Sequence, residues 1–122
     1  KIQKIILDVE KKTKKNKNIT VNIALNYSSK NEILNSFRRL IQKKNKKISI
    51  KDIHDNLYTS KIPDPEILIR TGGYQRLSDF LLWQISYSEL FFIKKLWPDF
   101  SYKDLNLILK KYHHIKRNFG AL

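Results

Sequence analysis

The sequence predicts an α/β fold in which a parallel sheet carries helices on both faces. Three short apolar runs have the length and the β-branched content of buried strands, and they cover residues 19–27, 66–70 and 89–93. Between and after these runs, apolar residues recur every three or four positions, which is typical of amphipathic helices. Strands that alternate with helices favour crossover connections between parallel strands. No internal repeat or boundary divides residues 1–122, so we expect all of them to belong to a single domain.

The N-terminal part of the chain is expected to supply two helices and the first strand. A helix is predicted over residues 2–12, and a lysine-rich connector separates it from the strand "ITVNIALNY" at 19–27. The second helix is predicted over 28–44, where Ser29 and Glu32 have the spacing of a capping box at its start. The expected apolar face of this helix consists of Ile33, Leu34, Phe37, Leu40 and Ile41.

The rest of the chain is expected to add three helices and two strands. Residues 49–57 predict a short helix opened by a serine, and the link "IPDPE" leads from it into the second strand. The segment "SDFLLWQISY" at 78–87 predicts a helix with Ser78 as its N-cap and Asp79 in its first turn. After the third strand and the turn "WPDF", residues 101–116 predict an amphipathic helix.

The composition excludes several classes of protein. Cysteine is absent, so the chain has neither a disulfide framework nor a thiolate metal site. No segment approaches the ~18 consecutive apolar residues of a membrane span. These features fit a cytoplasmic protein, which is the location we expect. Methionine is also absent, even at position 1, so we expect the chain to be a piece of a longer polypeptide.

The net charge of +14 has two interpretations. One is a polyanionic partner such as nucleic acid. The other is codon bias, because 47 of the 122 residues are Lys, Ile or Asn, whose codons are rich in A and T. Lysines number 20 and arginines only five, so arginine should persist mainly where a planar, bidentate fork is needed to bind phosphate or carboxylate. The arginines are Arg38, Arg39, Arg70, Arg76 and Arg117.

The stretch "RTGGYQRLSDF" has the features of an anion site. Arg70 ends a predicted strand, and ligands of open α/β sheets bind at the carboxyl ends of the strands. The glycine pair allows close approach of the backbone, and Ser78 with the start of the predicted helix would add hydroxyl and N–H donors. Arg70 and Arg76 could then hold a diphosphate from two sides. The alternative is a plain turn whose arginines make surface ion pairs.

Glu89 is a second candidate for function. It lies among apolar and aromatic residues in "YSELFFI" and is one of four glutamates in the chain. A carboxylate in such a place is costly unless it is paired or bound to a metal. A salt bridge to a nearby lysine or arginine is the equally weighted alternative.

These residues resemble a known family. The block "PEILIRTGGYQRLSDFLLWQISYSELFFIKKLWPDF" is similar to the C-terminal signature of the cis-prenyltransferases, in particular the bacterial undecaprenyl diphosphate synthase type. "ITVNIALNYSSKNEI" resembles an earlier strand and its Asn-Tyr turn, and "HHIKRNFG" resembles the closing arginine-rich segment. The similarity extends from about residue 17 to the end, so the resemblance implies the C-terminal part of a cis-prenyltransferase domain with a parallel sheet and helices on both faces.

The resemblance implies an activity and a set of site residues. The family condenses isopentenyl diphosphate onto an allylic diphosphate such as farnesyl diphosphate, with Mg²⁺, and makes Z double bonds. Arg70, Arg76, Leu77 and Ser78 match the positions that bind isopentenyl diphosphate, and Glu89 matches an acidic residue that coordinates Mg²⁺. The resemblance also implies a homodimer, peripheral membrane contact through the lipid product, and no nucleic-acid partner.

The chain departs from the family pattern at several points. Tyr74 stands where an acidic residue is usual, Gln75 stands where histidine is frequent, and Ser28 and Ser29 replace two glycines. The N-terminal block with the catalytic aspartate and the loop for the allylic diphosphate has no counterpart here, so no catalytic residue is expected in this chain and the fragment alone is expected to be inactive. The alternatives are a non-catalytic partner subunit of a two-component prenyltransferase and a basic nucleic-acid-binding module.

Overall fold

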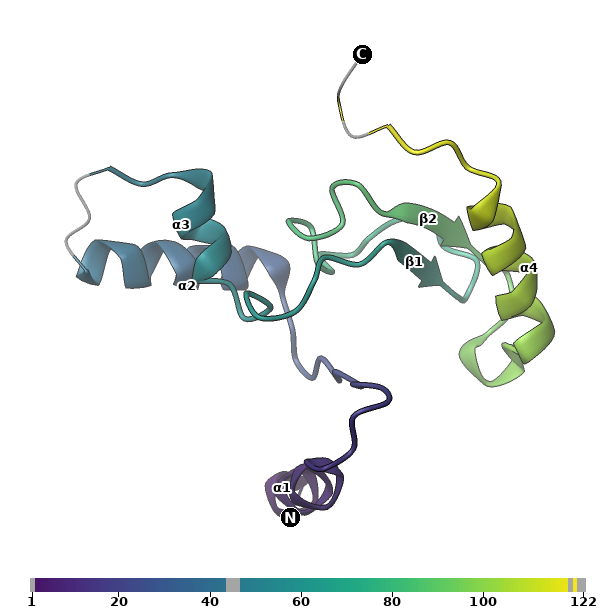
Figure 1. Ribbon diagram of the computed structural model, residues 1–122, viewed down its shortest axis with the longest axis horizontal. Helices are drawn as coiled ribbons and strands as arrows, with labels where there is room; N and C mark the ends of the chain where they lie inside the picture. Colours follow the sequence, from purple (N-terminus) through teal and green to yellow (C-terminus); the bar gives the residue numbers. More distant parts are fainter. Residues whose placement is uncertain (1, 44–46, 119, 121–122) are drawn as a thin grey trace.

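The computed structural model describes residues 2–43, 47–118 and 120, in which three helices precede two strands, and a 3-10 helix and a fourth helix follow (Figure 1). In chain order they are α1 (Ile2–Thr13), α2 (Ser29–Gln42), α3 (Ile50–Asp55), β1 (Ile67–Arg70), β2 (Glu89–Phe92), the 3-10 helix η1 (Trp97–Asp99) and α4 (Tyr102–His113).

The sheet consists of β1 and β2, which run parallel. Ile67 pairs with Glu89 at the start of the ladder, and Arg70 pairs with Phe92 at its end. The register confirms the second and third predicted strands, their parallel direction and the α/β class. It also places Arg70 at the carboxyl edge of the sheet and Glu89 at the opposite edge.

Four predicted helices are confirmed as α1 to α4, and the serine predicted to open α3 is its N-cap. The Ser49 side chain accepts a hydrogen bond from the N–H of Asp52, whose carboxylate accepts one from the Ser49 N–H, and this capping box starts α3. Ser101 and Asp104 form the same capping box at the start of α4. Since each box satisfies N–H groups that have no partner inside the helix, local sequence is enough to fix these starting points. The other two confirmed helices are α1 and α2.

The predicted strand at 19–27 is wrong, because residues 19–27 form no strand. The alternating apolar side chains of this segment are all exposed: Ile19, Val21, Ile23 and Leu25. Within the described part of the chain, β1 and β2 pair only with each other. A strand needs a neighbour for its backbone hydrogen bonds, so a β-branched pattern without a partner stays irregular.

The predicted helix at 78–87 is also wrong, since these residues form a series of turns. Ser78, Asp79 and Leu81 have φ values of 49°, 63° and 47°, which lie in the left-handed region and exclude a right-handed helix. Ser78 is therefore not an N-cap. The physical reason is tertiary, because the backbone of this segment bonds to the start of α2. The Ser29 N–H donates to the Asp79 carbonyl (2.9 Å) and the Leu82 N–H donates to Ser29 Oγ (3.0 Å).

Helix α2 begins one residue earlier than its predicted capping box implies. Ser28 is the N-cap, and its hydroxyl accepts a hydrogen bond from the N–H of Asn31 (3.2 Å). The predicted apolar face is wrong as well, because only Leu40 of that set is buried. The buried face of α2 is mostly polar and consists of Ser29, Glu32, Ser36 and Leu40.

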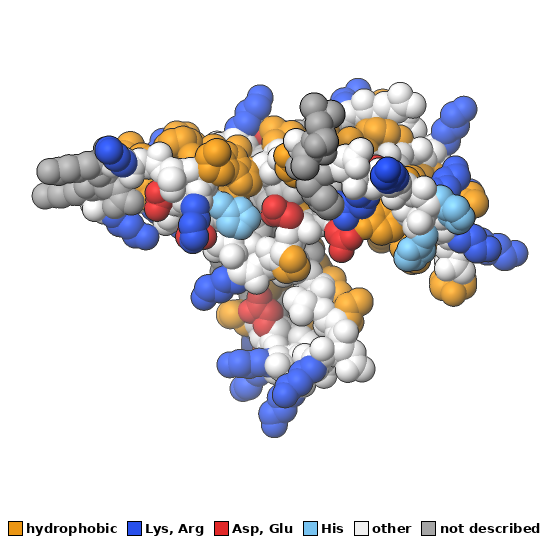
Figure 2. All heavy atoms as spheres, turned by 45° about the horizontal axis from the view of Figure 1, so that its top comes forward, with side chains coloured by type: hydrophobic (Ala, Val, Ile, Leu, Met, Phe, Trp, Pro, Cys, Tyr) orange, Lys and Arg blue, Asp and Glu red, His pale blue; other side chains and the backbone are white. Residues whose placement is uncertain are grey.

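The elements are spread out around a small core. In Figure 1, α2 and α3 lie on one side of the sheet, α4 lies on the other, and α1 stands apart from both. The buried hydrophobic residues are few: Leu40, Leu57, Ile85 and Ile108. Figure 2 shows hydrophobic side chains on the surface over several elements, and no residue of α1 is buried. Over the part of the chain that the structure describes, no helix is long and apolar enough to cross a membrane.

Candidate functional site

The loop after β1 is held at the carboxyl edge of the sheet by backbone bonds. We call residues 70–78 the arginine loop. The Gly72 N–H donates to the Lys95 carbonyl (2.8 Å) and the Gly73 N–H donates to the Ile93 carbonyl (2.9 Å). Both glycines have positive φ, 88° and 78°, which residues with a Cβ rarely adopt. The glycine pair therefore lets the chain turn sharply while it stays bonded to the segment that follows β2.

The arginine loop contains the four residues predicted to bind isopentenyl diphosphate. The Arg70 guanidinium donates to Ser78 Oγ (3.0 Å) and to the backbone carbonyl of Arg76. Leu77 lies between them, half-buried, and its carbonyl accepts a bond from the Phe80 N–H (3.2 Å). Arg70 thus organises the loop from inside, while the Arg76 side chain is exposed.

The arginines of the loop are not used in surface ion pairs. The salt bridges among the described residues involve Lys51, Lys95 and Arg117, and none joins a carboxylate to Arg70 or Arg76. Two guanidinium groups in one loop without an acidic partner leave a concentration of positive charge. This geometry supports an anion site over the alternative of a plain turn with ion pairs.

An aromatic ring lies against both guanidinium groups. The Arg76 guanidinium carbon is 4.2 Å from the centre of the Tyr74 ring, and that of Arg70 is 5.8 Å from it. Both distances fall within the range of cation–π contacts, which extends to about 6 Å. The Tyr74 side chain is itself exposed.

Asp79 attaches the end of the arginine loop to the start of α2. Its carboxylate accepts hydrogen bonds from the Ser28 hydroxyl (2.6 Å) and from the N–H of Lys30 (3.0 Å). The hydroxyl of Ser28, followed by the N–H of Lys30, holds the pKa of the Asp79 carboxyl below its usual value. A carboxylate near a helix N-terminus is also favoured by the helix dipole. The positive end of α2 is therefore occupied by a residue of the chain itself.

Glu32 is the centre of a buried polar network that sequence reasoning missed. Its side chain is fully buried and accepts hydrogen bonds from the backbone N–H of Tyr58 (2.7 Å), from Gln84 Nε2 (3.0 Å) and from the Tyr27 hydroxyl. Gln84 Nε2 also donates to Thr59 Oγ1 (2.8 Å). Burial, and then the bond to Glu32, raises the pKa of Tyr27 to about 12. The network joins α2 to the two segments that flank β1.

The signal that could have revealed this network is the spacing of polar residues on α2. Ser29, Glu32 and Ser36 recur three and four positions apart, in line with Leu40, so they form one helical face. A polar stripe continuous with a core leucine indicates a buried hydrogen-bonded face. The residues that would complete the network lie 26 and 52 positions away, and no local pattern connects them.

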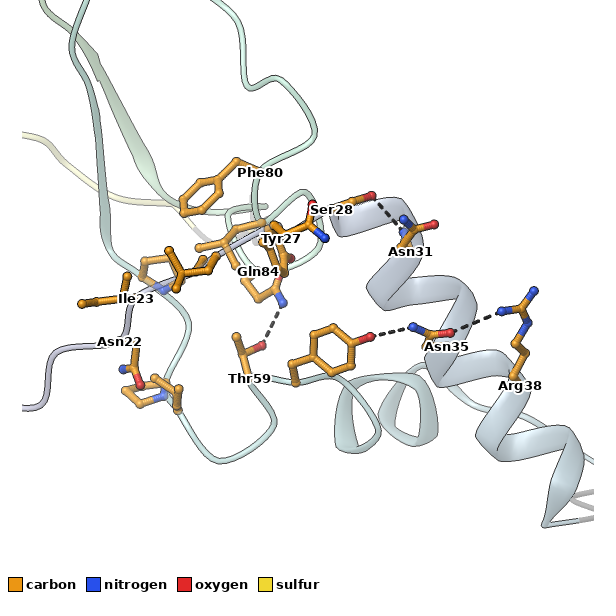
Figure 3. A pocket seen from close by; sticks show the side chains of 18 residues that line it. Asn22, Ile23, Tyr27, Ser28, Asn31, Asn35, Arg38, Thr59, Phe80 and Gln84 are labelled. Atoms are coloured by element: carbon orange, nitrogen blue, oxygen red, sulfur yellow. Dashed lines mark hydrogen bonds between the residues drawn. The ribbon is translucent and has the colours of Figure 1, made fainter. Parts of the chain in front are cut away.

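A pocket of about 720 Å³ lies beside this network (Figure 3). Tyr27, Ser28, Thr59, Phe80 and Gln84 contribute to its wall, and none of the residues of the arginine loop does. Gln84 Oε1 is buried and has no hydrogen-bond partner among the described residues. The pocket and the arginine loop are therefore separate features, joined by the attachment of Asp79 to Ser28 and by the bond from the Phe80 N–H to the Leu77 carbonyl.

Glu89 lies away from the two arginines of the loop, Arg70 and Arg76. It is at the first position of the β1–β2 ladder and Arg70 is at the last, three residues further, which corresponds to about 10 Å along a strand. Its carboxylate faces the Arg117 guanidinium at 4.0 Å, and Arg117 also pairs with Glu66 at 3.0 Å. The salt-bridge alternative for Glu89 is thus what the structure shows.

The fit of this region to a magnesium ion is incomplete. Among the described residues, no group of three His, Cys, Asp or Glu side chains could hold a metal. Glu89 can offer one carboxylate, but an arginine lies beside it. The described residues therefore do not form a magnesium site by themselves.

Comparison with known proteins gives one consistent result. Residues 1–120 match the family model Prenyltransf, described as "Putative undecaprenyl diphosphate synthase". An isoprenyl transferase of Fusobacterium nucleatum is 43% identical over 122 residues, which are 100% of this chain and 53% of that protein. The Micrococcus luteus ditrans,polycis-undecaprenyl-diphosphate synthase, specific for (2E,6E)-farnesyl diphosphate, is 40% identical over 98% of this chain and 51% of its own length.

Solved structures agree with the sequence comparison. A probable undecaprenyl diphosphate synthase from Campylobacter jejuni superposes with a TM-score of 0.84 at 33% identity, over 98% of this chain and 56% of that one. Lavandulyl diphosphate synthase from Lavandula x intermedia, in complex with dimethylallyl diphosphate, superposes with a TM-score of 0.89 at 32% identity, over 98% and 54% of the two chains. The chain thus spans about half the length of the relatives that it matches.

Proposed function

The chain belongs to the undecaprenyl diphosphate synthase family of cis-prenyltransferases, and we propose that its arginine loop binds the diphosphate group of isopentenyl diphosphate. One observation supports the proposal above all. Arg70, Arg76 and Ser78 lie in one loop at the carboxyl edge of the parallel sheet, and no carboxylate pairs with either arginine among the described residues. Guanidinium groups match the geometry of phosphate oxygens bidentately, and the Ser78 hydroxyl adds a further donor.

In the complete protein, this loop would hold one of two substrates for condensation. The second substrate would be an allylic diphosphate such as farnesyl diphosphate, and the product a Z-polyprenyl diphosphate. Condensation needs both diphosphates in register, so that the allylic carbon meets the isopentenyl double bond. The proposed site accounts for only one of the two diphosphates, and we therefore expect the 122-residue chain alone to show no transferase activity with farnesyl diphosphate, radiolabelled isopentenyl diphosphate and Mg²⁺.

Glu89 as a Mg²⁺ ligand stays a prediction. A single carboxylate can share Mg²⁺ with substrate phosphate oxygens and water. Arg117 lies beside Glu89, and the described residues contain no complete set of metal ligands. Substrate oxygens, water or other residues of the complete protein would have to complete the site. A cytoplasmic location and peripheral membrane contact through the lipid product also stay predictions.

Site-directed variants of the complete protein test the diphosphate site. Each arginine would make charge-assisted bonds worth roughly 1.5–3 kcal/mol, so Arg70→Ala or Arg76→Ala should lower kcat/KM for isopentenyl diphosphate about 10- to 150-fold. Arg→Lys variants should recover only part of this loss, because lysine lacks the planar fork. Arg38→Ala is the matched control, since it removes the same charge from an exposed position on α2. Unchanged kinetics in both alanine variants would refute the assignment.

We also propose that the run "ELFFI" at 89–93 and the following "WPDF" at 97–100 contribute to a two-fold interface. Leu90, Leu96 and Trp97 are large apolar side chains with exposures of 42%, 62% and 73%. Exposed apolar clusters of this kind are frequent at protein interfaces. Analytical ultracentrifugation of the complete protein at micromolar concentration tests the proposal, and a monomer under these conditions would reject it.

A further inference from the structure

Tyr74 occupies an unusual place in the arginine loop. It lies between the two arginines in sequence, two residues before Arg76 and four after Arg70. Its ring centre is 4.2 Å from the Arg76 guanidinium carbon and 5.8 Å from that of Arg70. One exposed ring therefore contacts both cations of the proposed diphosphate site.

This contact holds the two cations in a different way from an ion pair. Two guanidinium groups in one loop repel each other, and long exposed side chains adopt many rotamers. A carboxylate, which is usual at this position in the family, would hold both groups by ion pairs and would accept hydrogen bonds from some of their N–H donors. The face of an aromatic ring attracts a guanidinium without adding a net negative charge, and it takes none of the five N–H donors.

The two contacts of Tyr74 involve arginines that are held to different extents. Arg70 is already fixed, because its guanidinium donates to the Arg76 carbonyl and to Ser78 Oγ. The Arg76 side chain is exposed, and its contact with the Tyr74 ring is the shorter one. The ring is thus placed to restrict the more exposed arginine and to hold it near the fixed one.

We propose that Tyr74 is a positioning residue that holds Arg76 beside Arg70 in the arrangement that binds a diphosphate. The inference rests on the proposed function of the arginine loop and adds a residue to it. It assigns the effect to the π face of the ring and not to the hydroxyl. Tyr74 itself makes no contact with the substrate in this scheme.

The first experiment measures binding of inorganic pyrophosphate to the complete protein by isothermal titration calorimetry. Tyr74→Ala and Tyr74→Leu should weaken binding about 2- to 5-fold, the effect expected for a cation–π contact at an exposed site. Tyr74→Phe keeps the ring and should bind within about twofold of the wild type. Tyr102→Ala is the matched control, because Tyr102 is an exposed tyrosine of α4. Equal thermal unfolding midpoints show that the variants are folded.

A double-mutant cycle shows whether Tyr74 acts through Arg76. If it does, Tyr74→Ala should cause little further loss in an Arg76→Ala background, because the group that the ring positions is gone. In steady-state kinetics, Tyr74→Ala should raise KM for isopentenyl diphosphate and leave kcat near the wild-type value. The same loss in both backgrounds would show an independent role and overturn the proposal.

The outcomes also separate this inference from the proposed function. If the wild type and Arg76→Ala bind pyrophosphate equally, the diphosphate site itself is wrong. If the wild type binds, Arg76→Ala does not, and Tyr74→Ala binds like the wild type, then only the positioning role is wrong. A loss in Tyr74→Phe as large as in Tyr74→Ala would assign the effect to the hydroxyl and would also overturn the proposal.

Discussion

Replacing Glu32 with alanine should destabilise the protein strongly. The side chain is fully buried at the start of α2, and it accepts hydrogen bonds from the Tyr58 N–H, from Gln84 Nε2 and from the Tyr27 hydroxyl. Alanine removes the acceptor and leaves these donors in place. The half-buried Tyr27 hydroxyl can donate to water instead, and Gln84 keeps its hydrogen bond to Thr59. The greatest loss is therefore the hydrogen bond from the Tyr58 N–H.

The size of the effect follows from the bonds that are lost. Hydrogen bonds to a charged group contribute about 1.5–3 kcal/mol each. The bonds from Tyr58 and Gln84 together then account for roughly 3–6 kcal/mol, a large part of the 5–15 kcal/mol that is typical of a whole domain. Removal of a buried charge offsets some of this loss, because its desolvation no longer opposes folding. Glu32→Gln should cost less than alanine, about 1–3 kcal/mol, because one oxygen remains and a single donor then faces the new amide group.

Urea denaturation of the complete protein, followed by circular dichroism, measures these differences. We expect the order of stability to be wild type, then Glu32→Gln, then Glu32→Ala. Glu10→Ala is the control, since Glu10 is exposed on α1 and its removal should change the free energy of unfolding by less than about 0.5 kcal/mol. If Glu32→Ala unfolded at the wild-type urea concentration, or if Glu32→Gln were less stable than Glu32→Ala, the hydrogen bonds to Glu32 would not stabilise the fold.

Two further predictions concern the groups that border this network. The pKa of Tyr27 is raised to about 12, so its contribution to stability is complete below pH 10.0 and is lost as the pH rises from there towards 12. Urea denaturation at pH 9, 10 and 11 should therefore show that the free energy of unfolding falls more steeply with pH in the wild type than in Tyr27→Phe. Equal slopes in the two proteins would contradict this prediction. The pKa of Asp79 is lowered, chiefly by the Ser28 hydroxyl, so its contribution is present above pH 3.8 and disappears as the pH falls below that value. Asp79→Ala should detach the arginine loop from α2 and weaken pyrophosphate binding about 2- to 10-fold, with Asp64→Ala, at an exposed position, as the control.

The elements that could be predicted from sequence are those whose causes are local. The capping boxes at Ser49 and Ser101 fix the starts of α3 and α4 within a few residues of themselves. The runs at 66–70 and 89–93 became strands because each is the partner of the other. Within the described residues, the run at 19–27 has the same pattern and no partner. The pattern shows what a segment can form, and pairing decides whether it does.

The two helical errors have one cause, which lies in the contact between α2 and residues 78–84. The serine and aspartate at 78 and 79 have the chemistry of a helix start, but the Asp79 carboxylate and carbonyl bond to the first residues of α2 instead. On α2 itself, an apolar stripe was expected to face inward, and the polar stripe through Glu32 faces inward because Gln84 and Tyr58 meet it there. Both outcomes depend on residues more than 20 positions apart, which periodicity cannot connect.

The loss of the predicted helix changes how the arginine loop can bind an anion. A helix after Ser78 would have added free N–H groups and a dipole to the site, but residues 78–87 form turns and the positive end of α2 is already occupied by Asp79. The attraction for a diphosphate must then come from the charges of Arg70 and Arg76, on a loop that the glycines and Asp79 hold in place. Screening by salt weakens interactions between exposed charges. Affinity for pyrophosphate should therefore fall steeply as ionic strength rises, and this dependence should become shallower in Arg76→Ala, which carries one charge fewer.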